Sequence, residues 1–332
     1  MTSSVSGPNP QRILFIRTDR LGEVLLNLPA LVALRQAYPR AHLAMMTSPE
    51  LRALLEGVPD IDQLLEYRDD RTRPWWMSAV ALAGGLRDQQ FDLAVISNAK
   101  KAFHLAAALA GIPIRVGYNR KWGWLLTHRV EDRKALGERH EVEYNLDLIQ
   151  RLGLPREVPS WQLPHFEPEQ RDVLQQLRRQ GIQPSEPLIA VHPWTSHPLK
   201  QWPADRFRQL IQRVAKTLPV KVVVIGGPEE RDRVSAVLSS GMPVANLVGD
   251  VTLRQLAALL RHARLLVSND SGPVHVAAAV NTKTVVLFGA PTVATGPRRW
   301  GPWGSGHVVI WKPSMDAITV EEVFRAVQQL FR

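Results

Sequence analysis

The sequence contains no cysteine, which excludes disulfides, thiolate metal ligands and cysteine nucleophiles. No apolar run approaches the roughly 20 residues that a membrane-spanning helix needs. Residues 1–10 are polar and lack the apolar core of a signal peptide. These absences lead us to expect a cytoplasmic protein.

Acidic residues are also in short supply, with 31 Asp and Glu against 41 Lys and Arg, which gives a net charge of +10. Residues 1–165 carry 21 basic and 18 acidic side chains (net +3), and residues 166–332 carry 20 and 13 (net +7). There is no run of five basic residues, and aromatic residues do not alternate with Lys and Arg as in a base-stacking surface. Nucleic acid is therefore a minor hypothesis, and a phosphorylated substrate or an acidic membrane face is favoured.

The content of hydrophobic residues, 45%, is that of a globular protein, and 332 residues suit two domains. Short β-branched runs alternate with amphipathic stretches, a pattern that predicts parallel strands joined by helices. The expected strands are 12–17, 42–46, 93–97, 114–117, 188–192, 221–225, 246–248, 265–268 and 284–288. The expected helices are 23–37, 75–89, 102–110, 140–152, 204–218, 229–238, 253–261 and 271–280.

The composition changes at 154–187, where six prolines surround one helical patch at 170–180. This proline-rich segment predicts the join between the domains. We expect an α/β protein of two Rossmann-like αβα domains facing a cleft, residues 1–165 and 166–318. Thr319 and Glu322 form a capping box for a last helix that ends at Phe331. This helix, 319–332, is a candidate to pack back on the first domain.

Three strand-to-helix turns of the second half carry side chains suited to a phosphorylated ligand. Asp270-Ser271-Gly272 opens an alanine-rich helix that contains His275, and a helix start with small residues suits a diphosphate. The loop after strand 188–192 offers Thr195, Ser196 and Lys200 as donors to phosphate oxygens, and the turn at 225–230 offers Glu230 for ribose hydroxyls. Each turn also has a purely structural interpretation. The turn at Asp270 would be an ordinary helix cap, the loop at Thr195 a surface loop over packed tryptophans, and the turn at Glu230 an acidic helix start.

The turn after the first strand presents Glu23 as a general base, with Asp19 as its rival, beside Arg17 and Arg20. The alternative is a capped, salt-bridged helix start. Asp60-Ile61-Asp62 has the spacing of a metal-binding pair, but it follows Gly57-Val58-Pro59 and is interpreted as a turn entering an edge strand, so no metal is assigned.

Two tryptophan clusters complete the set of unusual features: Trp75-Trp76 and Trp122/Trp124, near Arg71, Arg73, Arg120 and Lys121. They suit either a lipid headgroup region or the core.

Taken together in their order, these turns resemble glycosyltransferase family 9, the ADP-heptose:lipopolysaccharide heptosyltransferases. The resemblance covers nearly the whole chain and rests on 13–31, 115–118, 140–143, 192–203, 226–231, 269–279 and 288–292. It implies a GT-B fold with the acceptor on the N-terminal domain and the donor on the C-terminal one. It also implies inverting, metal-independent transfer of heptose from ADP-heptose to an anionic lipopolysaccharide core or lipid A-type acceptor, with no cofactor. A cytoplasmic enzyme in peripheral contact with the inner membrane fits this activity.

The resemblance also implies roles for single residues. Glu23 and Lys200 would be catalytic, Lys200 by offsetting charge on the departing ADP. The donor would be bound by Thr195, Ser196, Lys200, Glu230, Asp270, Ser271, Gly272 and His275, and the acceptor by Arg17, Asp19, Arg20 and Arg120.

One departure from the family pattern concerns position 23, which is commonly Asp and here is Glu. The longer side chain keeps the carboxylate and either preserves the base or signals a divergent acceptor. Two alternatives therefore stay open: a family member that uses another nucleotide sugar for a different cell-envelope glycan, and a noncatalytic nucleotide-sugar-binding protein.

Overall fold

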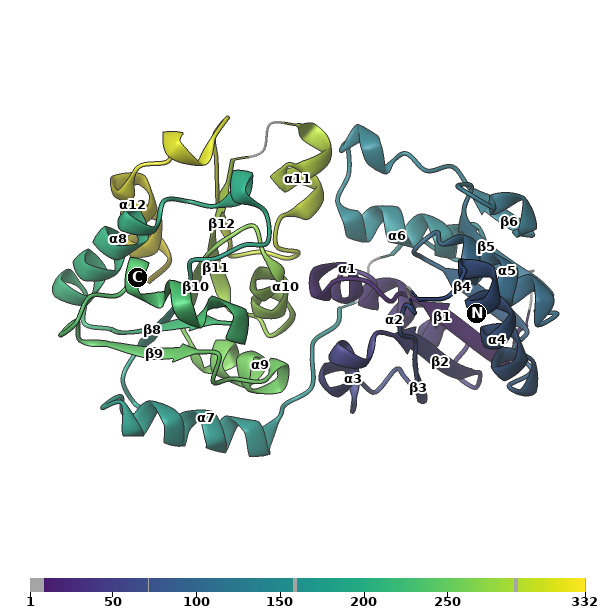
Figure 1. The fold of residues 1–332 in the computed structure, drawn as a ribbon, viewed down its shortest axis with the longest axis horizontal. Helices are drawn as coiled ribbons and strands as arrows, with labels where there is room; N and C mark the ends of the chain where they lie inside the picture. Colours follow the sequence, from purple (N-terminus) through teal and green to yellow (C-terminus); the bar gives the residue numbers. More distant parts are fainter. Residues whose placement is uncertain (1–8, 71, 158–159, 290–291, 332) are drawn as a thin grey trace, which may run out of the picture. The chain divides into compact units, whose positions relative to one another are not determined.

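The computed structural model describes residues 9–70, 72–157, 160–289 and 292–331, and it divides into two units, Met1–Trp161 and Gln162–Arg332. Each unit is an αβα domain with its own parallel sheet, as the alternating pattern predicts (Figure 1). Some residues used in the sequence interpretation lie outside the described residues: 1–8, Arg71, Pro159 and Pro291.

The N-terminal unit begins with a buried strand and builds a six-stranded sheet of order β3-β2-β1-β4-β5-β6, in which every neighbouring pair is parallel. Its strands are β1 (Arg12–Ile16), β2 (His42–Thr47), β3 (Gln63–Glu66), β4 (Leu93–Ile96), β5 (Ile114–Tyr118) and β6 (His128–Val130). Its helices are α1 (Leu21–Leu25), α2 (Leu28–Ala37), α3 (Pro49–Leu55), α4 (Trp75–Asp88), α5 (Lys101–Leu109) and α6 (Glu141–Gln150), with 3-10 turns η1 (Gly123–Leu125) and η2 (Lys134–Leu136).

The core of this unit forms because alternate strand residues project to opposite faces of the sheet. Leu14 and Ile16 of β1 pack with Ala94 and Ile96 of β4 beneath the paired helices α4 and α5. Helices α2 and α6 contact each other elsewhere in the unit.

The C-terminal unit repeats the arrangement, with a parallel sheet of order β12-β11-β10-β7-β8-β9. Its strands are β7 (Leu188–His192), β8 (Lys221–Gly226), β9 (Val244–Val248), β10 (Leu265–Asn269), β11 (Lys283–Phe288) and β12 (Val308–Trp311). Its helices are α7 (Glu167–Arg179), α8 (Ala204–Thr217), α9 (Leu253–His262), α10 (Gly272–Ala279), α11 (Pro297–Trp300) and α12 (Val320–Phe331), with 3-10 segments η3 (Pro198–Lys200), η4 (Pro228–Ala236), η5 (Val293–Thr295) and η6 (Met315–Ala317).

In both sheets the chain starts in the middle, builds outward to one edge, and then crosses back to build the other side. The crossing points lie between β1 and β4 and between β7 and β10. Ligands of such sheets bind beyond the carboxyl ends of the strands at these crossing points. The topology therefore gives each unit one preferred place for a binding site.

The last helix lies in the C-terminal unit, which corrects the expectation that helix 319–332 packs back on the first domain. Val323, Phe324 and Val327 of α12 are buried in the core of this unit with β7, β8 and α8. The Trp202 indole N–H also donates to the Ile318 carbonyl (3.0 Å), just before the helix begins. Burial of this apolar face within the C-terminal unit determines where the helix lies.

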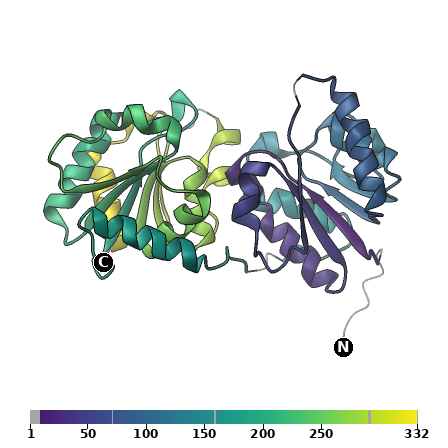
Figure 2. The ribbon, with the colours of Figure 1, turned by 60° about the horizontal axis from the view of Figure 1, so that its bottom comes forward.

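The join between the domains is shorter than the proline pattern suggests. The units divide after Trp161, four residues before the expected boundary at 165/166, and α7 belongs to the C-terminal unit. There α7 packs on α9 (Figures 1 and 2), Glu169 pairs with Arg254 (3.3 Å) and Gln180 bonds twice to the Asn246 backbone. These contacts are between residues far apart in sequence, so the composition of the join does not reveal them.

Two expected helices differ from the structure. The helix 23–37 is two helices, α1 and α2, which are separated at Leu26-Asn27 because Pro29 starts a new first turn. The segment 229–238 is the 3-10 segment η4, whose run of charged residues offers little apolar face for an α-helix to bury. Strands β6 and β12 and helices α3 and α11 were not predicted. The interpretation of Asp60–Asp62 as a turn entering an edge strand is confirmed, because β3 follows it and lies at the edge of its sheet.

Candidate functional site

The predicted phosphate-binding turns converge at the crossing point of the C-terminal sheet. Strand β7 ends at His192 and β10 at Asn269, and Ser268 lies opposite His192 in the parallel register. The loop that carries Thr195 and Lys200 follows β7, and Asp270 follows β10. Two segments about 70 residues apart in sequence thus meet at one edge of the sheet.

Lys200 and Asp270 form an ion pair at this edge. The Asp270 side chain is 9% exposed and that of Lys200 is 34% exposed, so a partly exposed lysine pairs with a buried carboxylate. Burial raises the pKa of Asp270, and the neighbouring Lys200 ammonium acts against that rise. The Thr195 hydroxyl donates to the Asp270 backbone carbonyl (3.3 Å), which fixes the loop to the strand end.

At the start of α10, the backbone N–H groups are not capped by a side chain. Ser271 is the N-cap residue, but its side chain makes no capping hydrogen bond. Its hydroxyl lies instead 2.9 Å from the Ser268 hydroxyl and 3.2 Å from Nδ1 of His192. The helix begins at Gly272, and the backbone N–H groups of a first turn, together with the helix dipole, favour an anion.

Glu230 lies at the neighbouring strand end and is held from two sides. Its Oε2 accepts the Gly227 N–H (2.6 Å) and lies 3.8 Å from Nε2 of His192. Burial acts to raise the pKa of Glu230, but the His192 side chain and the Gly227 N–H outweigh it and lower the pKa. A Cβ on Gly226 would lie 2.7 Å from this carboxylate and 2.7 Å from the Trp194 ring, so only glycine fits there.

Two residues that the sequence interpretation did not assign to the site hold its parts together. His192 lies between Glu230 and the Ser268–Ser271 pair. Asn269, fully buried, accepts the Trp202 N–H (3.2 Å) and donates to the Pro193 carbonyl (2.9 Å), which anchors both ends of the Thr195–Lys200 loop. The signal for both was available: each is a polar residue that ends a buried strand.

The other predicted donor residues lie nearby in the fold. Ser196 is exposed in the same loop, and Gly272 is the first residue of α10. His275 is buried (5% exposed) one turn into α10. The structure thus brings Thr195, Lys200, Asp270, Ser271 and Gly272 to one strand edge, with Glu230 linked through His192.

The N-terminal turn lies at the crossing point of its own sheet. Arg17 follows β1 and is buried, and its Nε lies 2.6 Å from Oδ1 of Asp19. Its Nη1 donates to the Ser97 hydroxyl (3.3 Å), just beyond β4. The Arg17 guanidinium therefore ties the two central strands together.

Glu23 lies on α1, and within the described part of the chain its carboxylate forms no ion pair. Burial raises the pKa of Glu23, its own backbone N–H lowers it, and the Asp19 charge adds to the rise while Arg17 and Arg20 act against it. A carboxylate with a raised pKa is a better proton acceptor near neutral pH. Asp19, in contrast, is neutralised by Arg17.

Buried amides hold the short helix α1 in place. Asn27 donates to the Glu23 carbonyl (2.7 Å) and accepts the Ser97 hydroxyl (2.5 Å). Asn145 of α6 donates to the Leu26 carbonyl (3.1 Å) and accepts from Lys134 (2.9 Å). A five-residue helix is marginal alone, so these contacts fix the direction in which Glu23 projects.

Of the two remaining predicted acceptor residues, Arg20 lies next to this network and Arg120 lies apart from it. Arg20 is exposed at the start of α1, and Arg120 follows β5, two strands from β1, where it pairs with Asp132 (2.9 Å). The Asp60–Asp62 turn has a structural use, because Asp62 accepts the Leu43 N–H (2.7 Å) and pairs with Arg35. Across the described ranges, no three His, Asp or Glu side chains gather as a metal-binding group.

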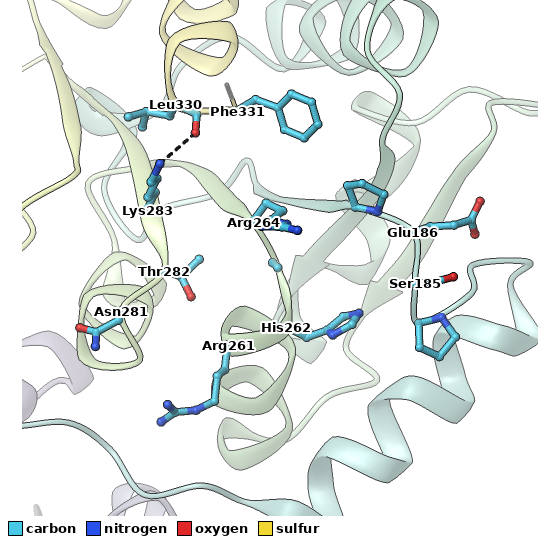
Figure 3. Close-up of a pocket in the computed structure, with 13 residues that line it drawn as sticks. Ser185, Glu186, Arg261, His262, Arg264, Asn281, Thr282, Lys283, Leu330 and Phe331 are labelled. Carbon is cyan, nitrogen blue, oxygen red and sulfur yellow. Dashed lines mark hydrogen bonds between the residues drawn. The ribbon is translucent and has the colours of Figure 1, made fainter.

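A cavity of about 550 Å³ lies at the amino ends of the strands of the C-terminal sheet (Figure 3). Thr282 and Lys283, at the amino end of β11, line it with Arg261 and Arg264, and Lys283 donates to the Leu330 carbonyl (3.3 Å). Ligands of parallel sheets bind at the carboxyl ends of the strands. The cavity is therefore distinct from the Lys200–Asp270 edge.

Two Rossmann-like units, each with a parallel six-stranded sheet, give the chain the architecture of the GT-B fold. Residues 79–326 match the family described as glycosyltransferase family 9 (heptosyltransferase). The chain belongs to this family. In the part of the chain that the structure describes, no helix combines the length and apolar character needed to span a membrane.

Individual relatives agree with this assignment. The chain is 26% identical over 302 residues to lipopolysaccharide heptosyltransferase 3 of Escherichia coli, covering 87% of this chain and 86% of that protein. A family 9 glycosyl transferase from Veillonella parvula has a similar structure (TM-score 0.86, 23% identity, 96% and 97% of the two chains). So does the E. coli ADP-heptose lipopolysaccharide heptosyltransferase II (TM-score 0.81, 24% identity, 96% and 98%).

Proposed function

We propose that this glycosyltransferase transfers heptose from ADP-heptose to an anionic lipopolysaccharide core or lipid A-type acceptor, with inversion at the anomeric carbon. The observation that carries the proposal is the Lys200–Asp270 pair at the start of α10, in a chain of family 9. The names of the relatives, which include a lipopolysaccharide heptosyltransferase and an ADP-heptose enzyme, support the substrate class.

In the proposed donor complex, the diphosphate lies against the first turn of α10 at Ser271 and Gly272. Ser196 and His275 donate to its oxygens, Thr195 does so once its hydroxyl turns away from the Asp270 carbonyl, and Glu230 accepts from the ribose hydroxyls. Lys200 offsets the negative charge that builds on ADP as it departs, and Asp270 holds Lys200 in position and faces the sugar. Fixed donors of this kind supply the largest electrostatic contribution to such a reaction.

Transfer is a single displacement. The acceptor oxygen forms a bond to the anomeric carbon on the face opposite the diphosphate, and the bond from that carbon to the phosphate oxygen breaks. The electron pair leaves with ADP, and Glu23 takes the proton of the acceptor hydroxyl. The pairing of Asp19 with Arg17 favours Glu23 over Asp19 for this role.

On the acceptor side, Arg20 and Arg120 supply positive charge for a phosphorylated glycolipid, with Asp19 and Arg17 shaping the turn. Charge stabilisation by Lys200 and α10 leads us to propose transfer without a metal or a cofactor. We place the enzyme in the cytoplasm, in peripheral contact with the inner membrane where its acceptor lies.

The test is a turnover assay in which ADP release and the mass of the acceptor are followed together, with and without EDTA. We expect one ADP for each heptose added, and full activity in EDTA. Turnover with a different nucleotide sugar alone would favour the alternative donor, and donor binding without turnover over a panel of acceptors would favour a binding protein. The binding protein is the second candidate function, because Glu23 stands at a position that is commonly Asp in the family.

A further inference from the structure

The outer face of α4 is unusual for a helix at a protein surface. No charged residue occurs between Pro74 and Leu86. Trp76, Met77 and Val80 are 52%, 42% and 52% exposed. The exposed surface continues over Ala81, Gly84 and Gly85, while Ala79, Ala83 and Leu86 face the core. A surface helix normally places polar residues on its outer face, so this face is apolar where water would favour charge.

A row of tryptophans extends this apolar surface beyond the helix. The Trp75 ring meets the Trp122 ring edge-on at 4.9 Å, and Trp122 lies 5.7 Å from Trp124. Trp124, on η1, is 62% exposed. The start of α4 and the η1 turn therefore form one continuous aromatic surface within the N-terminal unit.

Exposed cations border these tryptophans. Lys101 lies 5.7 Å from the centre of the Trp75 ring, and Arg129 donates to the Trp124 carbonyl (3.0 Å). A cavity of about 440 Å³ beside Trp75 is lined by four cations, Arg73, Lys100, Lys101 and Lys121, and by two carboxylates, Asp69 and Asp70. The carboxylates pair with Lys100 (2.6 Å) and Arg73 (3.2 Å), so the surface has an excess of positive charge.

We propose that this surface docks on an anionic lipid bilayer. We call it the α4 face and define it by Trp76, Met77, Val80 and Trp124 with Arg73, Lys101, Lys121 and Arg129. Tryptophan prefers the headgroup level of a membrane, and Lys and Arg next to it attract anionic lipids. At 14 residues α4 is too short to span a bilayer, so it lies in the interface plane.

The charge pattern favours a bilayer over a protein partner. Cations around an apolar centre match a layer of phosphate groups over acyl chains. The proposed function enters only through the lipid nature of the acceptor. Vesicle binding is measured without donor or acceptor, so the two proposals fail separately.

The first experiment uses sedimentation with vesicles of phosphatidylcholine alone or mixed with phosphatidylglycerol. The wild type is expected to bind the mixed vesicles, more weakly at high salt, and to bind neutral vesicles poorly. Replacing Trp76 and Trp124 together by Ser should lower vesicle affinity about tenfold or more. Trp311→Ser is the matched control, because Trp311 is also 52% exposed but lies on β12 of the C-terminal unit.

The second experiment uses the absence of cysteine. Val80→Cys introduces the single thiol of the chain, to which an environment-sensitive fluorophore is attached. Its emission should shift to the blue on mixed vesicles, whereas a label at Val309→Cys, 39% exposed on β12, should not shift. This readout stands even if the double tryptophan variant fails to fold.

Two controls separate docking from catalysis. Lys200→Ala should keep full vesicle binding, and the Trp76/Trp124 variant should keep ADP release with a soluble acceptor that lacks acyl chains. Unchanged vesicle affinity of the Trp76/Trp124 variant overturns the proposal. The proposal is also overturned if the wild type does not bind anionic vesicles, or if the emission of both fluorophores shifts equally.

Discussion

The Nε atom of Arg17 lies 2.6 Å from Oδ1 of Asp19, and this ion pair gives the two carboxylates of the first turn different properties. Asp19 is neutralised by a buried guanidinium, whereas burial raises the pKa of Glu23. A base with a raised pKa keeps more affinity for the proton it has to take.

Glu23→Gln should lower kcat about 10²–10⁴-fold, because the amide cannot accept the proton of the acceptor hydroxyl. Donor binding should stay at the wild-type level, as measured by the rise in Tm with added ADP. Glu23→Asp is the matched variant and should regain part of the activity. Near-wild-type turnover of Glu23→Gln would assign the base to Asp19 or to the substrate.

The raised pKa of Glu23 also predicts a pH dependence of stability. A carboxyl whose pKa is raised on folding favours the folded state below its ordinary pKa and loses that advantage as pH rises through the raised value. Glu23→Gln should therefore increase the free energy of unfolding in urea at pH 7.5. The increase should vanish at a pH below the ordinary pKa of glutamate. A loss of stability at pH 7.5 would contradict the assigned burial cost.

Lys200→Ala should lower kcat/KM about 10²-fold or more, because charge on the departing ADP is no longer offset. Lys200→Arg keeps the charge and should retain more activity. Lys216→Ala, which changes an exposed lysine of α8, is the control for net charge. Equal kinetics of the Lys200→Ala and Lys216→Ala variants would remove Lys200 from the donor site.

Gly226→Ala should destabilise the protein by about 1–3 kcal/mol, because the new methyl group overlaps the Glu230 carboxylate and the Trp194 ring, each at 2.7 Å. Gly84→Ala is the control: no atom lies within 4 Å of its Cβ, and alanine is the better helix former. Urea denaturation of both variants measures the difference. Equal stability would show that the β8 turn relaxes freely.

Asn145→Ala should destabilise the N-terminal unit by about 1–3 kcal/mol, since the Leu26 carbonyl and Lys134 lose a buried partner. Because α1 also loses an anchor, kcat should fall while the Tm shift with ADP is unchanged. Gln150→Ala, at an exposed position of the same helix, is the control. A fall in stability with unchanged kcat would limit Asn145 to a structural role.

The sequence predicts a candidate donor site from residues that follow buried strands. The structure brings Thr195, Lys200 and Asp270 together as this placement predicts, since a parallel sheet brings the carboxyl ends of its strands to one edge. His192 and Asn269 were missed because they are the last residues of strands, where a polar side chain is easily taken as part of the strand. Their roles come from partners about 70 residues away.

The alternation of strands and helices, the division into two domains and the family can be predicted from the sequence, because periodicity and turn residues are local properties of the chain. Three features become apparent only in the folded molecule: the pairing of Arg17 with Asp19, the place of α12 in the C-terminal unit, and the packing of α7 on α9. Each of these features depends on an ion pair or on apolar contacts between residues that meet only when the chain is folded. An apolar face has to be buried, but the sequence does not say against which partner.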